Sequence, residues 1–204
     1  TQSELIRVAH LLADAARVET LRLFRVPGLV ADDKSAQDAL FDPVTEADRA
    51  AEKAMRAILA VERPGDGILG EEFGTKAGTS GLTWVLDPID GTRGYISGTP
   101  TWGILIAISD ATGPVFGIID QPYIGERFVG GFGVAEVTGP TGVTPLATRK
   151  RTSFATATLL STFPEVGSKL ERRAFEAVSS AVKLTRYGMD CYGYALLAAG
   201  QVDL

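Results

Sequence analysis

The sequence predicts an α+β fold in which helices and strands form stacked layers. Two observations carry this prediction. In the first part of the chain, apolar residues recur at helical spacing and then give way to short apolar runs separated by turn residues. Toward the C-terminus, helical and strand-like segments alternate, which indicates a further layer. We therefore expect an α+β half over residues 1–150 and the start of an incomplete α/β half over residues 151–204.

The N-terminal region predicts two helices. An apolar stripe at helical spacing indicates an amphipathic helix over about residues 3–25, which ends before Pro27. Residues 28–43 predict a loop or a short hairpin. A second helix is expected from Thr45, whose hydroxyl can cap its first turn, to about Val61.

The rest of the chain predicts a mostly antiparallel meander followed by alternating helices and strands. Short apolar runs bounded by turn residues mark the strands, and Asp110 to Gly113 supplies a tight turn between two of them. Strands are expected at residues 67–70, 82–86, 101–109, 115–120, 126–131, 133–137, 154–161 and 183–186, and helices at residues 168–182 and 192–199.

Composition limits the classes of function. The 204 residues carry 20 Lys and Arg against 25 Asp and Glu, which argues against charge-driven binding of nucleic acid. The longest uncharged stretch, residues 94–109, is too short and too rich in Gly and Pro to span a membrane. No signal-peptide pattern occurs at the N-terminus, so we expect a cytoplasmic location. Cys191 and His10 are single, which argues against disulfides and cysteine-based zinc sites.

The segment from Trp84 to Thr92 is the most informative one for chemistry. A buried strand delivers Asp87 to its C-terminal end, and Asp90 follows closely, so both carboxylates can point into one small volume. Glu71, which ends another apolar run, can add a third acid. These charges repel one another unless hard cations such as Mg²⁺ neutralise them. Two such ions could hold the attacking water and the leaving oxygen of a phosphate ester. The alternative is an ordinary turn, because Asp, Pro and Gly are common turn formers.

These motifs resemble the inositol monophosphatase superfamily of Mg²⁺-dependent phosphatases. The resemblance rests on Gly70-Glu71-Glu72, on Trp84-Val-Leu-Asp-Pro-Ile-Asp-Gly-Thr92 and on Pro43-Val-Thr-Glu-Ala-Asp48, and it extends from the first helix to Leu204. It implies a layered α/β sandwich whose N-terminal half, residues 1–150, binds the metal. The implied metal ligands are Glu71, Asp87, Asp90 and the carbonyl of Ile89. The implied water-activating residues are Asp48 and Thr92, and the implied phosphate site is the backbone of Gly91 and Thr92.

Two of these acids have simpler interpretations. Thr45-x-x-Asp48 is close to a capping box, in which Asp48 would accept an N–H group at the start of its own helix. For Glu72, a solvated surface charge is the better interpretation.

Two details are similar to histidinol-phosphate phosphatases of this superfamily. Arg93 follows the Asp90-Gly91-Thr92 segment, and Asp190 stands where inositol phosphatases carry a small residue. The resemblance implies that both bind substrate, and a carboxylate at position 190 could pair with the amine of histidinol phosphate. Asp190 could instead be the N-cap of the helix that follows.

We therefore expect a Mg²⁺-dependent phosphomonoesterase that hydrolyses histidinol phosphate in histidine biosynthesis. Hydrolysis of inositol 1-phosphate or a related sugar phosphate is the alternative reaction. A third alternative is a non-catalytic fragment that keeps the fold. The partner is expected to be a small phosphate monoester, with no nucleic acid and no membrane, and the resemblance implies a homodimer.

The last residues carry one more expectation. Gln201 to Leu204 has the pattern of the start of a strand. Members of the family carry a further metal-binding Asp in a Trp/Tyr-Asp-x-Ala segment, which neither Asp190 nor Asp203 matches. We therefore expect a fold truncated at its C-terminus, with a second metal short of one ligand and little activity in this chain alone.

Overall fold

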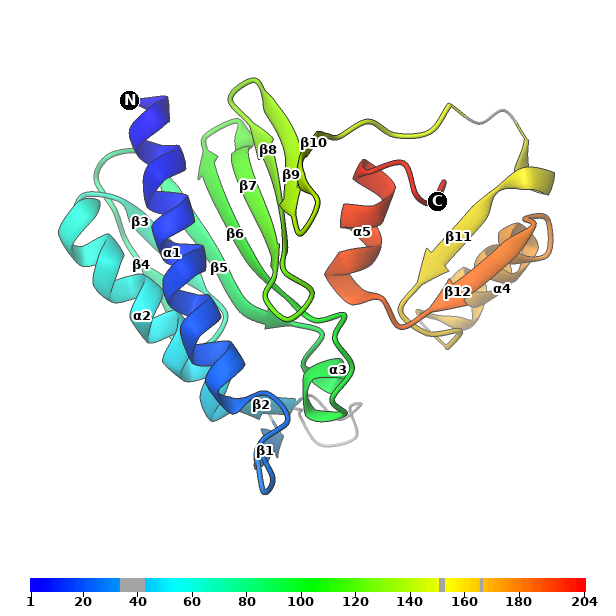
Figure 1. Cartoon of the computed structure of the whole chain (residues 1–204), viewed down its shortest axis with the longest axis horizontal. Helices are drawn as coiled ribbons and strands as arrows, with labels where there is room; N and C mark the ends of the chain where they lie inside the picture. Colours follow the sequence, from blue (N-terminus) through cyan, green and yellow to red (C-terminus); the bar gives the residue numbers. More distant parts are fainter. Residues whose placement is uncertain (34–42, 151–152, 166) are drawn as a thin grey trace.

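The computed structural model describes residues 1–33, 43–150, 153–165 and 167–204, and it has the predicted layers. Helices α1 (Gln2–Leu23) and α2 (Glu46–Glu62) cover one face of an eight-stranded sheet (Figure 1). Helix α5 (Asp190–Ala198) lies against the other face. No helix in the described ranges is long and apolar enough to cross a bilayer.

The large sheet is mixed rather than wholly antiparallel. Strands β3 and β5 run parallel, and all other neighbouring strands run antiparallel, in the order β10-β9-β8-β7-β6-β5-β3-β4. The strands are β3 (Gly67–Gly70), β4 (Gly74–Lys76), β5 (Thr83–Asp90), β6 (Gly103–Asp110), β7 (Gly113–Gln121), β8 (Glu126–Gly131), β9 (Val134–Gly139) and β10 (Gly142–Pro145).

Alternation along β5 separates the core from the site. Trp84 and Leu86 are buried in the core cluster that includes residues of α1 and α2. Because successive side chains of a strand point to opposite faces, Val85 and Asp87 lie on the other face of the sheet. There they line an apolar cavity of about 610 Å³ together with Ala195 of α5. The strand pattern therefore places Asp87 on the α5 side of the sheet.

A second core cluster joins the elements that carry the predicted site residues. It contains Phe24 after α1, Ala47 at the start of α2, Ile89 in β5, Tyr95 in α3 (Thr92–Ile96) and Trp102 before β6. The Tyr95 hydroxyl donates to the carbonyl of Thr20 at 2.7 Å, and the rings of Tyr95 and Trp102 make an edge contact at 4.9 Å. This packing brings the start of α2 beside the turn that follows β5.

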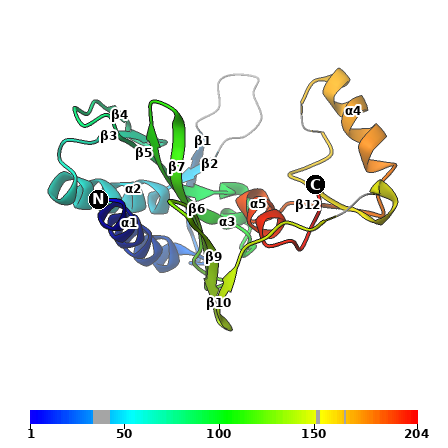
Figure 2. The same cartoon turned by 90° about the horizontal axis from the view of Figure 1, so that it is seen from above.

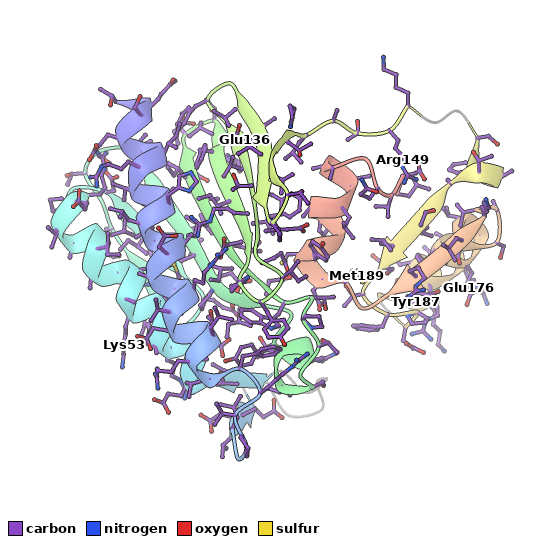
Figure 3. All side chains as sticks on the ribbon, viewed as in Figure 1. Lys53, Glu136, Arg149, Glu176, Tyr187 and Met189 are labelled. Atoms are coloured by element: carbon purple, nitrogen blue, oxygen red, sulfur yellow. The ribbon has the colours of Figure 1, made fainter. Side chains whose placement is uncertain are left out.

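The C-terminal part forms a small separate layer beyond α5. Figure 2 shows β12 and α4 beyond α5, on the side away from α1 and α2. Strands β11 (Thr158–Ser161) and β12 (Leu184–Tyr187) pair in parallel, and α4 (Lys169–Ser179) connects them. Arg149 lies near the C-terminal end of α5 (Figure 3), where its guanidinium donates to the carbonyl of Gly200.

Most predicted elements are confirmed, with differences at their ends. Residues 201–204 form no strand; they lie along β11, where the Leu160 N–H donates to the Leu204 carbonyl at 2.9 Å. The strand expected over 154–161 begins with a single turn of 3₁₀ helix at Phe154–Thr156, because the Ser153 hydroxyl accepts the Ala155 N–H and favours a turn. The sequence patterns missed β4, β10 and α3.

A hairpin near residue 30 is present as expected. Strand β1 (Ala31–Asp33) pairs antiparallel with β2 (Pro43–Thr45). Residues 34–42 of the predicted loop lie outside the described part of the chain.

Candidate active site

Two of the predicted acids meet where the parallel strands β3 and β5 end. Gly70 pairs with Leu86, and the Glu71 N–H donates to the Leu86 carbonyl at 3.1 Å, so Glu71 and Asp87 leave the same edge of the sheet. Burial, followed by the charge of Glu71, a hydrogen bond with Glu71 and the charge of Asp90, raises the pKa of Asp87 to about 9. The carboxyl group of Asp87 is therefore protonated at neutral pH when no cation is bound.

Asp90 is held by the other end of the chain. Its Oδ2 accepts the N–H of Cys191, in the first turn of α5, at 2.6 Å. Met189 occupies the N-cap position of α5 and makes no side-chain capping bond. Asp90 thus satisfies one of the backbone N–H groups that a helix start leaves without an intrahelical partner. The alternative interpretation of Asp190 as the N-cap is wrong, because this helix starts one residue earlier than such a cap requires.

The turn after β5 positions two further predicted residues. The strand continues through Pro88, but its pairing with β6 jumps from Asp87 to Asp90, because Pro88 has no N–H to donate. Asp87 Oδ1 accepts the Ile89 N–H at 3.1 Å, and the Thr92 hydroxyl donates to the Ile89 carbonyl at 3.0 Å. The Ile89 carbonyl, which the resemblance assigns to the metal, and the Thr92 hydroxyl, which it assigns to the attacking water, are thus in direct contact.

Asp190 lies against the same turn. Gly91 has φ +86°, and a Cβ at this position would come 2.7 Å from Oδ2 of Asp190, so the close approach requires glycine. Burial and the charge of Asp90 raise the pKa of Asp190, whereas the nearby Arg93 lowers it. The guanidinium of Arg93 lies 5.7 Å from the ring centroid of Phe163. The Asp190 carboxyl group therefore lies near the cationic Arg93 of this turn.

A cavity adjoins Asp190 between α5 and β11. It has a volume of about 300 Å³, and its lining combines apolar side chains with three hydroxyls and one side-chain carboxylate. Figure 3 shows Met189 at its wall, where the chain passes from β12 into α5. The lining residues are Leu160, Ser161, Thr162, Met189, Asp190, Gly193, Tyr194, Leu197 and Leu204.

Asp48 forms the capping box that its spacing predicts. Its Oδ2 accepts the Thr45 N–H at 2.8 Å and the Thr45 hydroxyl at 2.6 Å, and the Ala47 N–H donates to that hydroxyl. The Asp48 side chain is buried, and its charge acts with burial to raise the pKa of Tyr95. The capping interpretation is therefore confirmed. A role in catalysis would use the same side chain beside the turn of residues 89–92.

Removing this cap should be measurable in the absence of any substrate. We expect Asp48→Ala to lower the free energy of unfolding by about 0.5–2 kcal/mol, the usual range for loss of a helix cap. Urea unfolding followed by circular dichroism would measure it. Glu46→Ala, in the same first turn but outside the capping box, is the matched control. Equal stability of the Asp48 variant and the wild-type protein would contradict the capping role.

The carboxylates are not arranged as a finished metal cage. Within the described residues, no group of three or more Asp, Glu, His or Cys side chains is placed to hold a metal ion as it stands. The chemistry of the donors nevertheless fits a hard cation. Burial, followed by the charges of Glu71 and Asp90, raises the pKa of Asp87 so that it retains its proton, and a divalent cation relieves the repulsion among the three acids.

The raised pKa of Asp87 predicts a pH-dependent stability of the metal-free protein. The unfolded chain ionises this group from about pH 3.8, whereas the folded chain keeps the proton up to about pH 9, so the folded state loses stability as pH rises between these values. We expect Asp87→Asn to raise the Tm in EDTA, more at pH 8 than at pH 5. Calorimetric melts would measure the difference between variant and wild type. A difference that does not depend on pH would contradict the assignment.

Other candidates lie elsewhere or act indirectly. His10 contacts Arg127 on the α1 side of the sheet, away from the carboxylates of the candidate site. Burial and the charge of Arg127 lower the pKa of this histidine. Glu72 is half-buried, so it is partly solvated, as a surface charge would be. The sequence patterns missed Glu52, a fully buried acid on α2 whose carboxylate bonds to the turn that carries Glu71. The available signal was an acid on the apolar stripe of an amphipathic helix.

Comparison with known proteins defines the class. An inositol monophosphatase from Zymomonas mobilis superposes with a TM-score of 0.83 at 40% identity, over 98% of this chain and 75% of that one. The model of the inositol monophosphatase family matches residues 1–204. The fold is thus that of the inositol monophosphatases. The chain belongs to the inositol monophosphatase family.

Two curated relatives are similar at the sequence level. A histidinol-phosphatase of Streptomyces coelicolor is 38% identical over 98% of this chain and 76% of its own length. The chloroplastic bifunctional phosphatase IMPL2 of Arabidopsis thaliana is 38% identical over 97% of this chain. The match spans 55% of the plant protein, so this chain corresponds to about half the length of that relative.

Proposed function

We propose that this protein is a Mg²⁺-dependent phosphomonoesterase whose substrate is histidinol phosphate. The observation that carries the proposal is the meeting of Glu71 and Asp87 at the ends of two parallel strands, beside a turn that holds Asp90, Ile89 and Thr92. Membership of a family of metal-dependent phosphatases supports the same reaction class.

The residues that would hold Mg²⁺ are those implied by the resemblance. Glu71, Asp87 and Asp90 offer carboxylate oxygens, and Ile89 offers its carbonyl, which matches the preference of Mg²⁺ for oxygen ligands. Bound Mg²⁺ would supply positive charge that lowers the pKa of a water and stabilises the leaving oxygen. Since a carboxylate has two oxygens, Asp90 can keep its bond to the Cys191 N–H and still offer a ligand.

The remaining site residues would orient the reacting groups. Thr92 has its hydroxyl fixed by the Ile89 carbonyl, and we assign it, with Asp48, to hold the attacking water. The backbone N–H groups of Gly91 and Thr92 would bind the phosphate, and Arg93 adds a positive charge at the same turn. In this proposal the Thr92 hydroxyl would accept a proton from the water while its own proton passes to the Asp48 carboxylate, which is the general base.

The substrate assignment rests on Asp190 and on the adjoining cavity. A cavity of about 300 Å³ falls at the lower end of the usual range for small-molecule sites. Its single carboxylate, Asp190, would pair with the cationic amine of histidinol phosphate, and its apolar walls would contact the imidazole. The relatives named histidinol-phosphatase support this choice. The cytoplasmic location stays a prediction from the sequence, and the homodimer stays a prediction from the resemblance.

A panel of phosphate esters tests the proposal. Release of inorganic phosphate would be measured with histidinol phosphate, inositol 1-phosphate and a neutral polyol phosphate, each with Mg²⁺ and with EDTA. We expect release only with Mg²⁺ and the highest kcat/KM for histidinol phosphate. A higher kcat/KM for inositol 1-phosphate would favour the alternative, which the relative named inositol-1-monophosphatase from Mycobacterium leprae supports. Because little activity is expected of residues 1–204 alone, the panel is assayed with a chain that also carries the further metal-binding segment of the family, and no release from any ester would then overturn the proposal.

A further inference from the structure

A buried acid lies behind the turn that carries Glu71. Glu52, on α2, has none of its side chain exposed. Its carboxylate accepts three hydrogen bonds, from Arg56 Nε at 2.7 Å and from the backbone N–H groups of Glu72 at 2.7 Å and Phe73 at 3.2 Å. A buried charge needs such partners, and bonds to an ionised acceptor are the strong kind. Two of the three bonds therefore hold the backbone of Glu72 and Phe73.

The turn is shaped around this carboxylate. Gly70 and Gly74 pair as the last residues of β3 and the first of β4, and residues 71–73 connect them. A Cβ on Gly70 would lie 1.9 Å from Glu52 Oε1, so any side chain there would displace the carboxylate. Arg56, which pairs with Glu52, also donates to the Gly74 carbonyl. Glu52 and Arg56 together hold both ends of the turn.

Glu71 is thereby fixed from both sides. The residue before it, Gly70, leaves no room for a side chain beside Glu52. The N–H of the residue after it donates to Glu52, and its own N–H donates to the carbonyl of Leu86 in β5. Its backbone has little freedom to move relative to Asp87. Glu52 itself is separated from the reacting groups by this turn, so it can act only through Glu71.

We propose that Glu52 is a positioning residue that sets the affinity of the site for a divalent cation by holding Glu71 toward Asp87. The inference rests on the proposed Mg²⁺ site. Residues that hold a metal ligand in place without contacting the metal are typically important for its binding: their replacement lowers metal affinity or activity by about 10- to 100-fold. Glu52→Gln keeps the size of the side chain but removes the charge and places an N–H₂ group among donors.

The test is a calorimetric titration of the purified protein with Mg²⁺, in parallel with thermal melts. The matched control is Asp66→Asn. Asp66 is also a buried acid, bonded to Arg63 at 2.7 Å and to Trp84 Nε1 at 2.9 Å, but it lies at the opposite end of β3 from Glu71. We expect both variants to melt at lower temperature. Only Glu52→Gln should weaken Mg²⁺ binding, by about tenfold or more.

Each outcome decides one question. Equal Mg²⁺ affinity in Glu52→Gln and the wild-type protein would overturn the positioning role while leaving the proposed function intact. A wild-type protein without measurable Mg²⁺ binding would overturn the proposed function itself. If Glu52→Gln does not fold, Arg56→Lys takes its place, since a lysine keeps the charge but lacks the planar fork with which Arg56 bonds the carboxylate through one nitrogen and the Gly74 carbonyl through another. We then expect a several-fold loss of Mg²⁺ affinity, and an unchanged affinity would overturn the proposal.

Discussion

Replacing Asp87 with Asn is expected to lower the rate of phosphate release at least ~100-fold, in line with loss of a strong transition-state stabiliser. The physical reason is the position of this carboxylate. It is half-buried and interacts with the charges of both Glu71 and Asp90, so its own charge would act on any cation that these acids hold. The measurement is kcat with histidinol phosphate at saturating Mg²⁺.

A matched acid separates this effect from general damage. Asp110 accepts bonds from Thr112 in the exposed turn between β6 and β7, on the same sheet. Asp110→Asn should therefore keep its turnover. Near-normal turnover of Asp87→Asn with Mg²⁺ present would refute the assignment of Asp87 to the metal.

Asp190→Asn should change selectivity rather than catalysis. A cationic amine paired with a carboxylate contributes roughly 1.5–3 kcal/mol as a charged hydrogen bond, so kcat/KM for histidinol phosphate should fall by about tenfold to a hundredfold. A polyol phosphate has no ammonium group that could pair with Asp190, so it should be hydrolysed nearly as well as before. The two substrates, assayed with the same variant, give the comparison.

The pH dependence of this selectivity gives an independent check. Burial and Asp90 raise the pKa of Asp190, so its negative charge, and with it the preference for a cationic substrate, should increase as pH rises. Equal losses on both substrates in Asp190→Asn would mean that Asp190 only supports the turn at Gly91. The histidinol assignment would then depend on Arg93 and on the relatives alone.

Local chemistry could be predicted well from the sequence. Thr45 was expected to cap the second helix, and it does, because a capping box depends on residues within one turn. The hydrophobic stripe of α1 and the tight turn between β6 and β7 are local in the same way. The acids at the ends of β3 and β5 were found because each follows a recognisable apolar run.

Contacts between distant segments could not be predicted in this way. The α5 helix was expected to begin at Tyr192 and begins at Asp190, because the carboxylate that satisfies its first turn belongs to Asp90. Likewise, α3 is only five residues long and is fixed by Tyr95, which packs under Phe24 and Trp102. No periodicity in a five-residue segment can reveal such packing.

The bond between Asp90 and Cys191 also has a consequence for how the protein is made. It joins positions 101 residues apart, so a growing chain displays Asp87 and Asp90 long before their partner on α5 has been synthesised. An ion that binds only the completed arrangement lowers the free energy of that state alone, by mass action. If Mg²⁺ binds as proposed, it would thus selectively stabilise, during biogenesis, those chains whose helix α5 has docked.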